Sequence, residues 1–367
     1  MIQPTDRASL QAAVDSGHMF APPAVAIELD RPIVITKPSW LPQMQLLARP
    51  GCDVMIDLRC SRVTMDRVDL FCQGNATHGI VNKSGWDNEL TYLRGVCIRH
   101  AKSHAILSED GDCFFMRDYH PMFCGGYGLY SQNNLMNSSI HFAMTAETAG
   151  VYMTKRTQQP EGVDIGGKIV PLGQGRSGVV LEYGLKINIM ADSVIDQCGG
   201  WGLYCGPNVS DVTVCPGAWI GGTSNTALGS PHHPLVALNG CNRINIDGAS
   251  IVGGASDQLL AFPGTRLVTV KDTDFYDVAP GRANCNISGI QHSKVAFNRF
   301  WHARTGGVYG GNSLYWQGGD ASCAAYDNTS FFGSDPVKGS WGRDMNIGPA
   351  IRQRDNVNIQ LPAGWTH

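Results

Sequence analysis

The chain has 367 residues and a mass of 39.6 kDa, which is enough to bury a substantial core. Only 16% of its residues are charged, against roughly 25% in an ordinary soluble domain, and its 44 glycines exceed the usual share without a three-residue period. These values exclude an intrinsically disordered chain and a helical bundle rich in Glu and Lys, and the net charge of -3 gives no nucleic-acid-binding signature.

The N-terminal segment predicts one short helix. Residues 5–17, TDRASLQAAVDSG, begin with a capping residue, carry apolar side chains at helical spacing and end in glycine. The next segment, 20–57, is Pro-rich and is predicted to be irregular, so residues 1–57 are expected to form an N-terminal cap. No secretory signal is predicted after Met1, and no apolar stretch is long enough to predict a membrane span.

The middle of the chain contains a repeat. Short apolar strings recur every 22 to 32 residues, at 79–82, 105–108, 129–132, 151–154, 179–182, 203–206, 235–238, 259–262 and 284–287. Each later string is followed by an alternating apolar pair and a third apolar element. A residue suited to a left-handed bend follows the string at a fixed offset, at Gly184, Asn208, Gly240, Gly264 and Gly289.

Three short strands per repeat predict an all-β fold, a parallel β-helix, over residues 58–303. Beyond this range the period fades, and residues 304–367 are expected to form a C-terminal cap or assembly segment. Leucine-rich repeats need a different ladder of leucines, and propeller blades run about 40 to 45 residues, so neither class fits.

The N-terminal segment also carries a family resemblance. Thr5, Asp6 and the run 10–15, LQAAVD, resemble the TDD-TAALQAAIDAA type helix of the pectate-lyase-like right-handed parallel β-helix superfamily, especially of its bacteriophage tailspike and depolymerase members. In those proteins a VYLPPGTY type strand follows, where this chain has only MFAPP at 19–23. The resemblance implies a right-handed single-stranded solenoid, a homotrimer and a bacterial surface polysaccharide as the ligand.

One candidate site lies in the third strand of the repeat. Residues 274–277, DFYD, align with residues 299–302, RFWH, at an offset of 25. If the phenylalanines point inward, Asp274 faces Arg299, Tyr276 faces Trp301, and Asp277 neighbours His302. A carboxylate beside an imidazole and two aromatic rings predicts an acid–base pair on a sugar-stacking surface. The alternative is a cross-strand salt bridge covered by aromatic side chains.

A second candidate is Glu182, which the alternation places on the outer face. The outward positions of neighbouring strings are Tyr130, Tyr152 and Tyr204, whose rings are suited to stacking on sugars. Asp196 is predicted to approach Glu182, and two carboxylates roughly 5 to 9.5 Å apart perform glycoside hydrolysis. The alternative is that Glu182 pairs with a Lys or Arg on a solvated face.

Two long spacings predict loops beside this region. Residues 156–176 and 221–234 are interpreted as insertions at one corner, and insertions on one face of a solenoid commonly form its binding face. Arg156 in the first insertion is a candidate substrate ligand. The adjacent His232 and His233 in the second point apart on a strand, so no metal site is predicted there.

Metal and thiol chemistry have little support in the sequence. Glu109, Asp110 and Asp112 resemble part of a calcium loop, but the spacing lacks the D-x-[DN]-x-[DN]-G register with a closing Glu. Calcium at this turn is therefore one expectation and a plain acidic turn is the other; no other cofactor is predicted. The twelve cysteines contain no CxxC pair and are expected to be buried small hydrophobes.

The later strings predict an interface. Their outward positions would be Val236, Leu238, Leu260, Phe262 and Ile287, and an uncovered apolar strip is a liability on a monomer. We expect the segment after residue 303 or partner chains to cover this strip. Partner chains would agree with the homotrimer that the resemblance implies.

These observations predict a tailspike-like protein that binds and hydrolyses a bacterial surface polysaccharide. It would be located in the virion, with other virion proteins as further partners, after synthesis in the host cytoplasm. Two alternatives stay open. One is a non-catalytic structural or receptor-binding spike of the same fold, and the other is a secreted bacterial polysaccharide lyase or epimerase, which would need Ca²⁺ and an Arg or Lys base.

Overall fold

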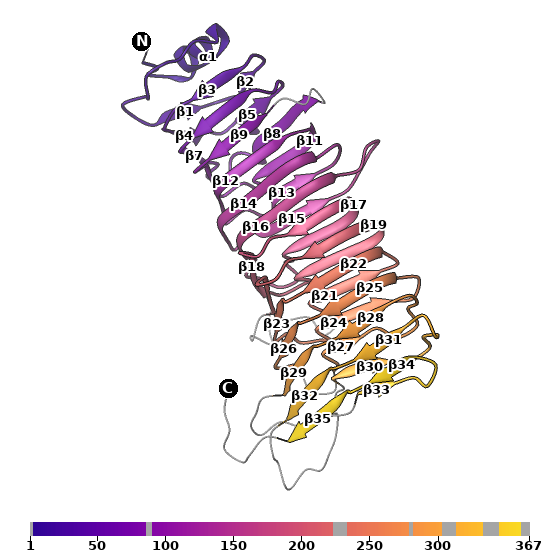
Figure 1. The fold of residues 1–367 in the computed structure, drawn as a ribbon. Helices are drawn as coiled ribbons and strands as arrows, with labels where there is room; N and C mark the ends of the chain where they lie inside the picture. The colour runs from indigo at the N-terminus through magenta and orange to yellow at the C-terminus, as the bar shows by residue number, and fades with distance from the viewer. Residues whose placement is uncertain are drawn as a thin grey trace. The chain divides into compact units, whose positions relative to one another are not determined.

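The computed structural model describes residues 3–85, 90–222, 233–278, 282–302, 313–332 and 345–360. The chain divides into two compact units, Met1–Pro171 and Leu172–His367. Within each unit the strands pair in parallel with the strands of the preceding and following coils, and they form three rows (Figure 1). The predicted all-β parallel β-helix is therefore confirmed.

The first unit has one helix and sixteen strands among its described residues. The helix is α1 (Arg7–Ser16). The first row holds β2 (Ile33–Ile35), β5 (Val54–Leu58), β8 (His78–Gly85), β11 (Ile106–Gly111), β13 (Tyr127–Ser131) and β15 (Ala149–Met153). The second row holds β3 (Ser39–Leu41), β6 (Val63–Asp66), β9 (Thr91–Arg94) and the first halves of β12 (Phe114–Met122), β14 (Met136–Ala146) and β16 (Glu161–Val170). The third row holds β1 (Ile27–Leu29), β4 (Met44–Ala48), β7 (Val68–Phe71), β10 (Cys97–Arg99) and the second halves of those three long strands.

The second unit repeats the three rows. The first row holds the starts of β17 (Val179–Ile189) and β19 (Leu203–Val214), then β21 (Val236–Asn239), β24 (Leu259–Phe262), β27 (Cys285–Asn286), β30 (Leu314–Trp316) and β33 (Asn346–Ile347). The second row holds the ends of β17 and β19, then β22 (Asn242–Asp247), β25 (Arg266–Lys271), β28 (Lys294–Ala296), β31 (Ala324–Tyr326) and β34 (Arg352–Arg354). The third row holds β18 (Val194–Cys198), β20 (Trp219–Gly222), β23 (Ser250–Val252), β26 (Asp274–Tyr276), β29 (Arg299–His302), β32 (Thr329–Phe332) and β35 (Val357–Gln360).

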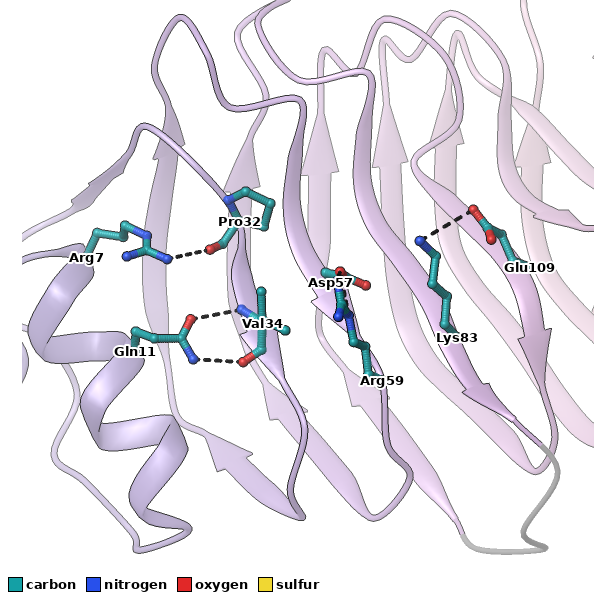
Figure 2. A network of polar contacts seen from close by, with 8 residues as sticks. All are labelled: Arg7, Gln11, Pro32, Val34, Asp57, Arg59, Lys83 and Glu109. Atoms are coloured by element: carbon teal, nitrogen blue, oxygen red, sulfur yellow. Dashed lines mark hydrogen bonds and ion pairs between the residues drawn. The ribbon is translucent and has the colours of Figure 1, made fainter.

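The predicted N-terminal helix is confirmed, and it covers the open edge of the first coils (Figure 1). Asp6 caps it through a capping box with Ser9, and Gly17 ends it in the left-handed conformation. Figure 2 shows Gln11 beside β2, where its amide donates to the carbonyl of Val34 at 2.8 Å and accepts from the Val34 N–H at 2.9 Å. A side chain thus satisfies backbone groups that a further strand would otherwise pair. Among the described residues, no helix is long and apolar enough to cross a membrane.

Two segments expected to be irregular are instead part of the rows. Strands β1 to β5 occupy most of residues 27–58, where short strands of alternating burial separate the prolines. Residues 161–170 form β16. This strand pairs with β14, beginning with Met136 opposite Glu161, so the interpretation of 156–176 as an insertion is wrong. The boundaries of the caps at 57 and 304 stay a prediction.

The core is a stack of apolar side chains, and asparagines on successive coils form a buried hydrogen-bonded ladder beside it. In the second unit the Asn298 amide donates to the Val270 carbonyl at 2.9 Å and to Asn328 Oδ1 at 3.0 Å, and Asn328 repeats the pattern with Asn356 at 2.9 Å. All twelve cysteines lie in the described residues and none forms a disulfide there; ten are buried as expected, and Cys60 and Cys215 are half-buried. Burial raises the pKa of the Cys52 thiol to about 11.

The predicted left-handed bends occur at three of five positions. Gly240, Gly264 and Gly289 have φ values of 67°, 92° and 75°. Gly184 and Asn208 instead lie inside the long strands β17 and β19, which run through from the first row into the second.

The apolar strip predicted on the second unit is largely wrong. Val236, Leu238 and Ile287 are fully buried in the core, while Phe262 is 37% exposed and Leu260 is half-buried. The register pairs Tyr204 with Ala237 rather than with Val236, and a one-residue shift moves every side chain of a strand to the other face. The homotrimer therefore stays a prediction that rests on the resemblance.

Candidate functional site

The second row of the first unit carries a groove of 820 Å³ on its outer face. Its lining comes from five successive coils, on β3, β6, β9, β12 and β14. The lining includes aromatic side chains at Trp40, Tyr92 and Phe115. It also includes charged side chains that lie two residues further along their strands and therefore on the same face.

The aromatic side chains of the groove belong to one column in register. Trp40 pairs with Thr64, Thr64 pairs with Tyr92, and Tyr92 pairs with Phe115. The Tyr92 and Phe115 rings stack, with centroids 5.5 Å apart and planes 29° apart. Thr64 is the one small residue between Trp40 and Tyr92, so the aromatic column has a gap at this coil.

The gap has the thickness of a sugar ring. Neighbouring strands lie roughly 4.8 Å apart, so the strands that carry Trp40 and Tyr92 lie roughly 9.6 Å apart. A ring in contact with an aromatic face on each side needs roughly 7 to 8 Å, at about 3.5 to 4 Å per carbon–carbon contact. A pyranose ring above Thr64 therefore fits between Trp40 and Tyr92.

A charged column runs beside the aromatic one. Asp66 pairs in register with Arg94, and Arg94 pairs with Arg117, so two guanidinium groups start from adjacent strands on the same face. Both arginines are exposed. Asp66 lies 3.6 Å from Arg67, and Arg117 lies 3.9 Å from Asp118. Arg94 has no ion-pair partner among the described residues, so the column can accept an external anion.

A second aromatic group lies on the first row of the same unit. Rings stack in the order His78, His104, Tyr130 and Tyr152, with centroid distances of 5.5, 4.4 and 4.8 Å. Tyr127 closes the group at 5.2 Å from Tyr152. His104 and Tyr130 each stack between two neighbours, whereas Tyr152 is the last ring of the stack. The predicted role of Tyr130 and Tyr152 in substrate binding stays a prediction.

Two histidines in this ladder have lowered pKa values. The backbone N–H of Tyr127 donates to Nδ1 of His104 at 3.1 Å, which requires an unprotonated nitrogen. Burial, and then the neighbouring His78, lowers the pKa of His104 to about 4. Burial likewise lowers the pKa of His78.

This ladder predicts a pH-dependent stability. The pKa of His104 is lower in the folded chain than its unfolded value of about 6.5, so its contribution is complete above pH 6.5 and is lost as the pH falls toward 4. We expect the free energy of unfolding, measured by urea titration, to fall between pH 7 and pH 4.5. His104→Asn keeps an acceptor for Tyr127 without titrating in this range, so it should flatten that decrease. His100→Asn, a change at an exposed histidine, should leave the decrease intact; an unchanged slope in His104→Asn would refute this role.

Arg156 and the acidic turn of the first unit have local partners. Arg156 donates to Oε1 of Gln132. Glu109 lies 3.7 Å from Lys83 (Figure 2), and Asp110 accepts from Asn133 at 3.4 Å. Asp112 is buried, and its Oδ1 accepts from the N–H of Cys113 at 2.7 Å. The three acids thus turn to three different partners, and no group of three metal-ligating side chains occurs in the described ranges. Calcium binding at this turn stays a prediction.

In the second unit, the structure does not bring Glu182 and Asp196 together. Glu182 lies where β17 passes from the first row into the second, at a break in its register with β19. Asp196 lies on β18 in the third row, which precedes the first-row part of β19 in the chain, and its Oδ1 accepts from the N–H of Gln197 at 2.8 Å. The two carboxylates therefore lie toward opposite ends of the first-row strands.

Tyr204 lies in an aromatic cluster of its own in the second unit. Its ring is 4.6 Å from that of Trp201, which contacts His233 at 4.8 Å, and its hydroxyl accepts from Asn239 at 3.1 Å. His232 and most of the predicted second insertion lie outside the described residues.

The cross-strand pairs predicted in the third row are confirmed. Asp274 accepts from Nε and Nη2 of Arg299 at 2.6 and 2.5 Å and from Nε1 of Trp301 at 3.1 Å. Tyr276 stacks on Trp301, with planes 6° apart. These bonds satisfy the Asp274 carboxylate and raise the pKa of Arg299, which favours the structural alternative for Asp274.

The other half of that candidate is less defined. The backbone N–H of Asp277 donates to the carbonyl of Trp301 at 3.2 Å, and Asp277 has a left-handed φ of 54°. The side chain of His302 lies outside the described residues, so the predicted acid–base pair of Asp277 and His302 stays a prediction.

Comparisons with known proteins concern the fold. No family model and no curated protein sequence matches the chain. Among solved structures, the chain is similar to the A-modules of two mannuronan C-5 epimerases of Azotobacter vinelandii. AlgE4 has 14% identity and a TM-score of 0.44, with 99% of this chain and 95% of that chain covered. AlgE6 has 11% identity and a TM-score of 0.49, with 98% and 96% covered.

A phage protein is also similar in structure. The Dettilon tailspike protein has 11% identity and a TM-score of 0.36, with 97% of this chain and 65% of that chain covered. The strand rows and their register, rather than these likenesses, define the architecture of each unit. The chain therefore has a parallel β-helix fold.

Proposed function

We propose that this chain binds an acidic polysaccharide along the groove of its first unit. The observation that carries the proposal is the gap at Thr64 between the in-register Trp40 and Tyr92. Sugar rings present C–H groups on their faces, and aromatic rings on both sides offer them dispersion contacts. Arg94 and Arg117, one position along the same face, supply charge-assisted hydrogen bonds to a carboxylate.

Two arginine substitutions test the acidic class. We expect a uronic-acid oligosaccharide to bind in isothermal titration, and its affinity to fall as salt rises. The double variant Arg94→Gln with Arg117→Gln should weaken this binding roughly tenfold, which corresponds to about 1.4 kcal/mol. Binding of a neutral oligosaccharide of equal length should not change.

Arg31→Gln is the matched control, because Arg31 is exposed in the same unit and does not line the groove. The proposal fails if neutral and acidic probes bind equally well, or if the double variant behaves like the Arg31 control.

Hydrolysis of the polysaccharide and a tailspike-like role in a virion are finer proposals. They rest on the sequence resemblance and on Glu182, which is half-buried and lies next to Gly206 of the following coil. Glu182→Gln removes the charge and keeps the shape, so it should abolish the release of reducing ends while oligosaccharide binding is retained. If the wild-type chain releases no reducing ends from any bacterial capsule or lipopolysaccharide, the chain is a binding protein. An ultraviolet-absorbing unsaturated uronide would identify a lyase instead.

A further inference from the structure

We propose that the second unit carries a separate ligand site, a slot that holds an acidic sugar residue between Lys294 and Arg352. A groove of 640 Å³ lies on the second row of that unit, over β28, β31 and β34. All of its lining residues belong to the second unit, so the site stands independently of the groove in the first unit.

The slot comes from the strand register. Lys294 pairs with Ala324, and Ala324 pairs with Arg352, so the three residues lie in one column on successive coils. The methyl group of Ala324 leaves a gap between two long cationic side chains whose strands are roughly 9.6 Å apart. Lys294 is half-buried and Arg352 is exposed. A ring that rests on Ala324 therefore lies between the strand positions of Lys294 and Arg352, and the Lys294 ammonium lies beside it over the Tyr326 ring.

The acids nearby are already paired elsewhere. Arg354 lies 3.1 Å from Asp327 and 3.2 Å from Asp355, so this third cation is neutralised within the protein. Asp320 accepts from the N–H of Ser322 at 2.9 Å. Among the described residues, neither Lys294 nor Arg352 has an ion-pair partner. In the described part of the chain, the two cations that flank this gap thus lack a counter-charge, and a carboxylate in the gap supplies it.

An exposed aromatic side chain beside the slot favours a sugar over a small free anion. The Tyr326 ring lies in the next column, with Lys294 Nζ 4.7 Å and Arg354 Cζ 5.3 Å from its centroid. Phe297 is 46% exposed and meets Tyr326 edge to face at 5.5 Å. Lys294 and Arg354 lie over the Tyr326 ring, so the exposed Phe297 is the apolar surface that remains for the C–H face of a sugar. A groove of 640 Å³ is also far larger than an inorganic anion requires.

Local hydrogen–deuterium exchange tests this site without interference from the first unit. The probes are a uronic-acid oligosaccharide, a neutral oligosaccharide of equal length and inorganic phosphate, each added to the full chain. We expect the acidic oligosaccharide to slow exchange in peptides that cover β28, β31 and β34. The protection should saturate and should persist in Thr64→Trp, which fills the gap of the first unit.

Two variants of the slot and one control complete the test. Ala324→Leu fills the gap, and Arg352→Gln removes an exposed charge without touching the core. Each should raise the oligosaccharide concentration needed for half-maximal protection roughly tenfold. For Arg352→Gln this is the effect of one lost charge-assisted contact. Arg266→Gln alters an exposed arginine of the same row outside the groove and should change nothing. Equal protection by phosphate or by the neutral probe would overturn the proposal, as would full protection in Arg352→Gln.

Discussion

The Thr64→Trp substitution is expected to lower the affinity for an acidic oligosaccharide roughly 30-fold, because an indole would occupy the gap between Trp40 and Tyr92. A ring stacked on both sides gains about 0.5 to 1.5 kcal/mol per face, and the loss of both faces corresponds to about 2 kcal/mol. The fold itself should tolerate the change. Thr64 is a half-buried outward residue, and an indole there would continue the stack of aromatic rings on neighbouring coils. Isothermal titration measures the affinity, and urea unfolding measures the stability.

Thr64→Val is the matched control for this prediction. Valine has nearly the shape of threonine, so it leaves the gap open and should bind the oligosaccharide as the wild type does. The groove is not the binding site if Thr64→Trp keeps wild-type affinity while its free energy of unfolding is unchanged.

Gly167→Ala is expected to destabilise the first unit by about 3 kcal/mol or more, which places it among severe single substitutions. Gly167 lies in β16 with a φ of 83°, and an added Cβ would lie 1.8 Å from the carbonyl oxygen of Phe142 and 2.7 Å from its carbonyl carbon. Backbone atoms of a paired strand cannot move aside as a flexible side chain can. Phe142 is itself fully buried against Tyr119, with ring centroids 5.5 Å apart. The strain therefore reaches the core.

Gly74→Ala separates the clash from the backbone conformation. Gly74 has a similar φ of 65°, but an added Cβ would meet nothing within 4 Å. Its cost should be about 1 to 2 kcal/mol, the usual cost of a left-handed non-glycine residue. If urea unfolding gives the two variants equal losses in the free energy of unfolding, the close approach of β16 to β14 is not what makes Gly167 necessary.

The repeat in the sequence predicts much of this architecture because each coil must return to the same place. A constant offset of 25 residues aligned Asp274 with Arg299 and Tyr276 with Trp301, and the structure has both pairs. Where the spacing between strings changes, the alignment slips. The strings pair Ile106 with Tyr130 by position, whereas the structure pairs Ile106 with Leu129. Loop length absorbs the difference, and spacing alone does not show on which side of a strand the extra residue falls.

The groove of the first unit was missed for a related reason. Its first strand, β3, lies within residues 20–57, whose prolines are typical of irregular structure. One signal was present in the sequence, since Tyr92-Leu93-Arg94 and Phe115-Met116-Arg117 repeat the order aromatic, apolar, arginine. Only the pairing of β9 with β12 turns this pattern into neighbouring side chains on one face. The gap at Thr64 could not be inferred from the sequence, because the register that places Trp40 and Tyr92 on either side of Thr64 is known only from the strand pairing.

A crystal structure of the chain with a bound uronic-acid oligosaccharide tests the central claim most directly. The strand register predicts a sugar ring above Thr64, between the rings of Trp40 and Tyr92, with its carboxylate near Arg94 and Arg117. An oligosaccharide bound elsewhere on the first unit, with the gap between Trp40 and Tyr92 empty, would contradict it.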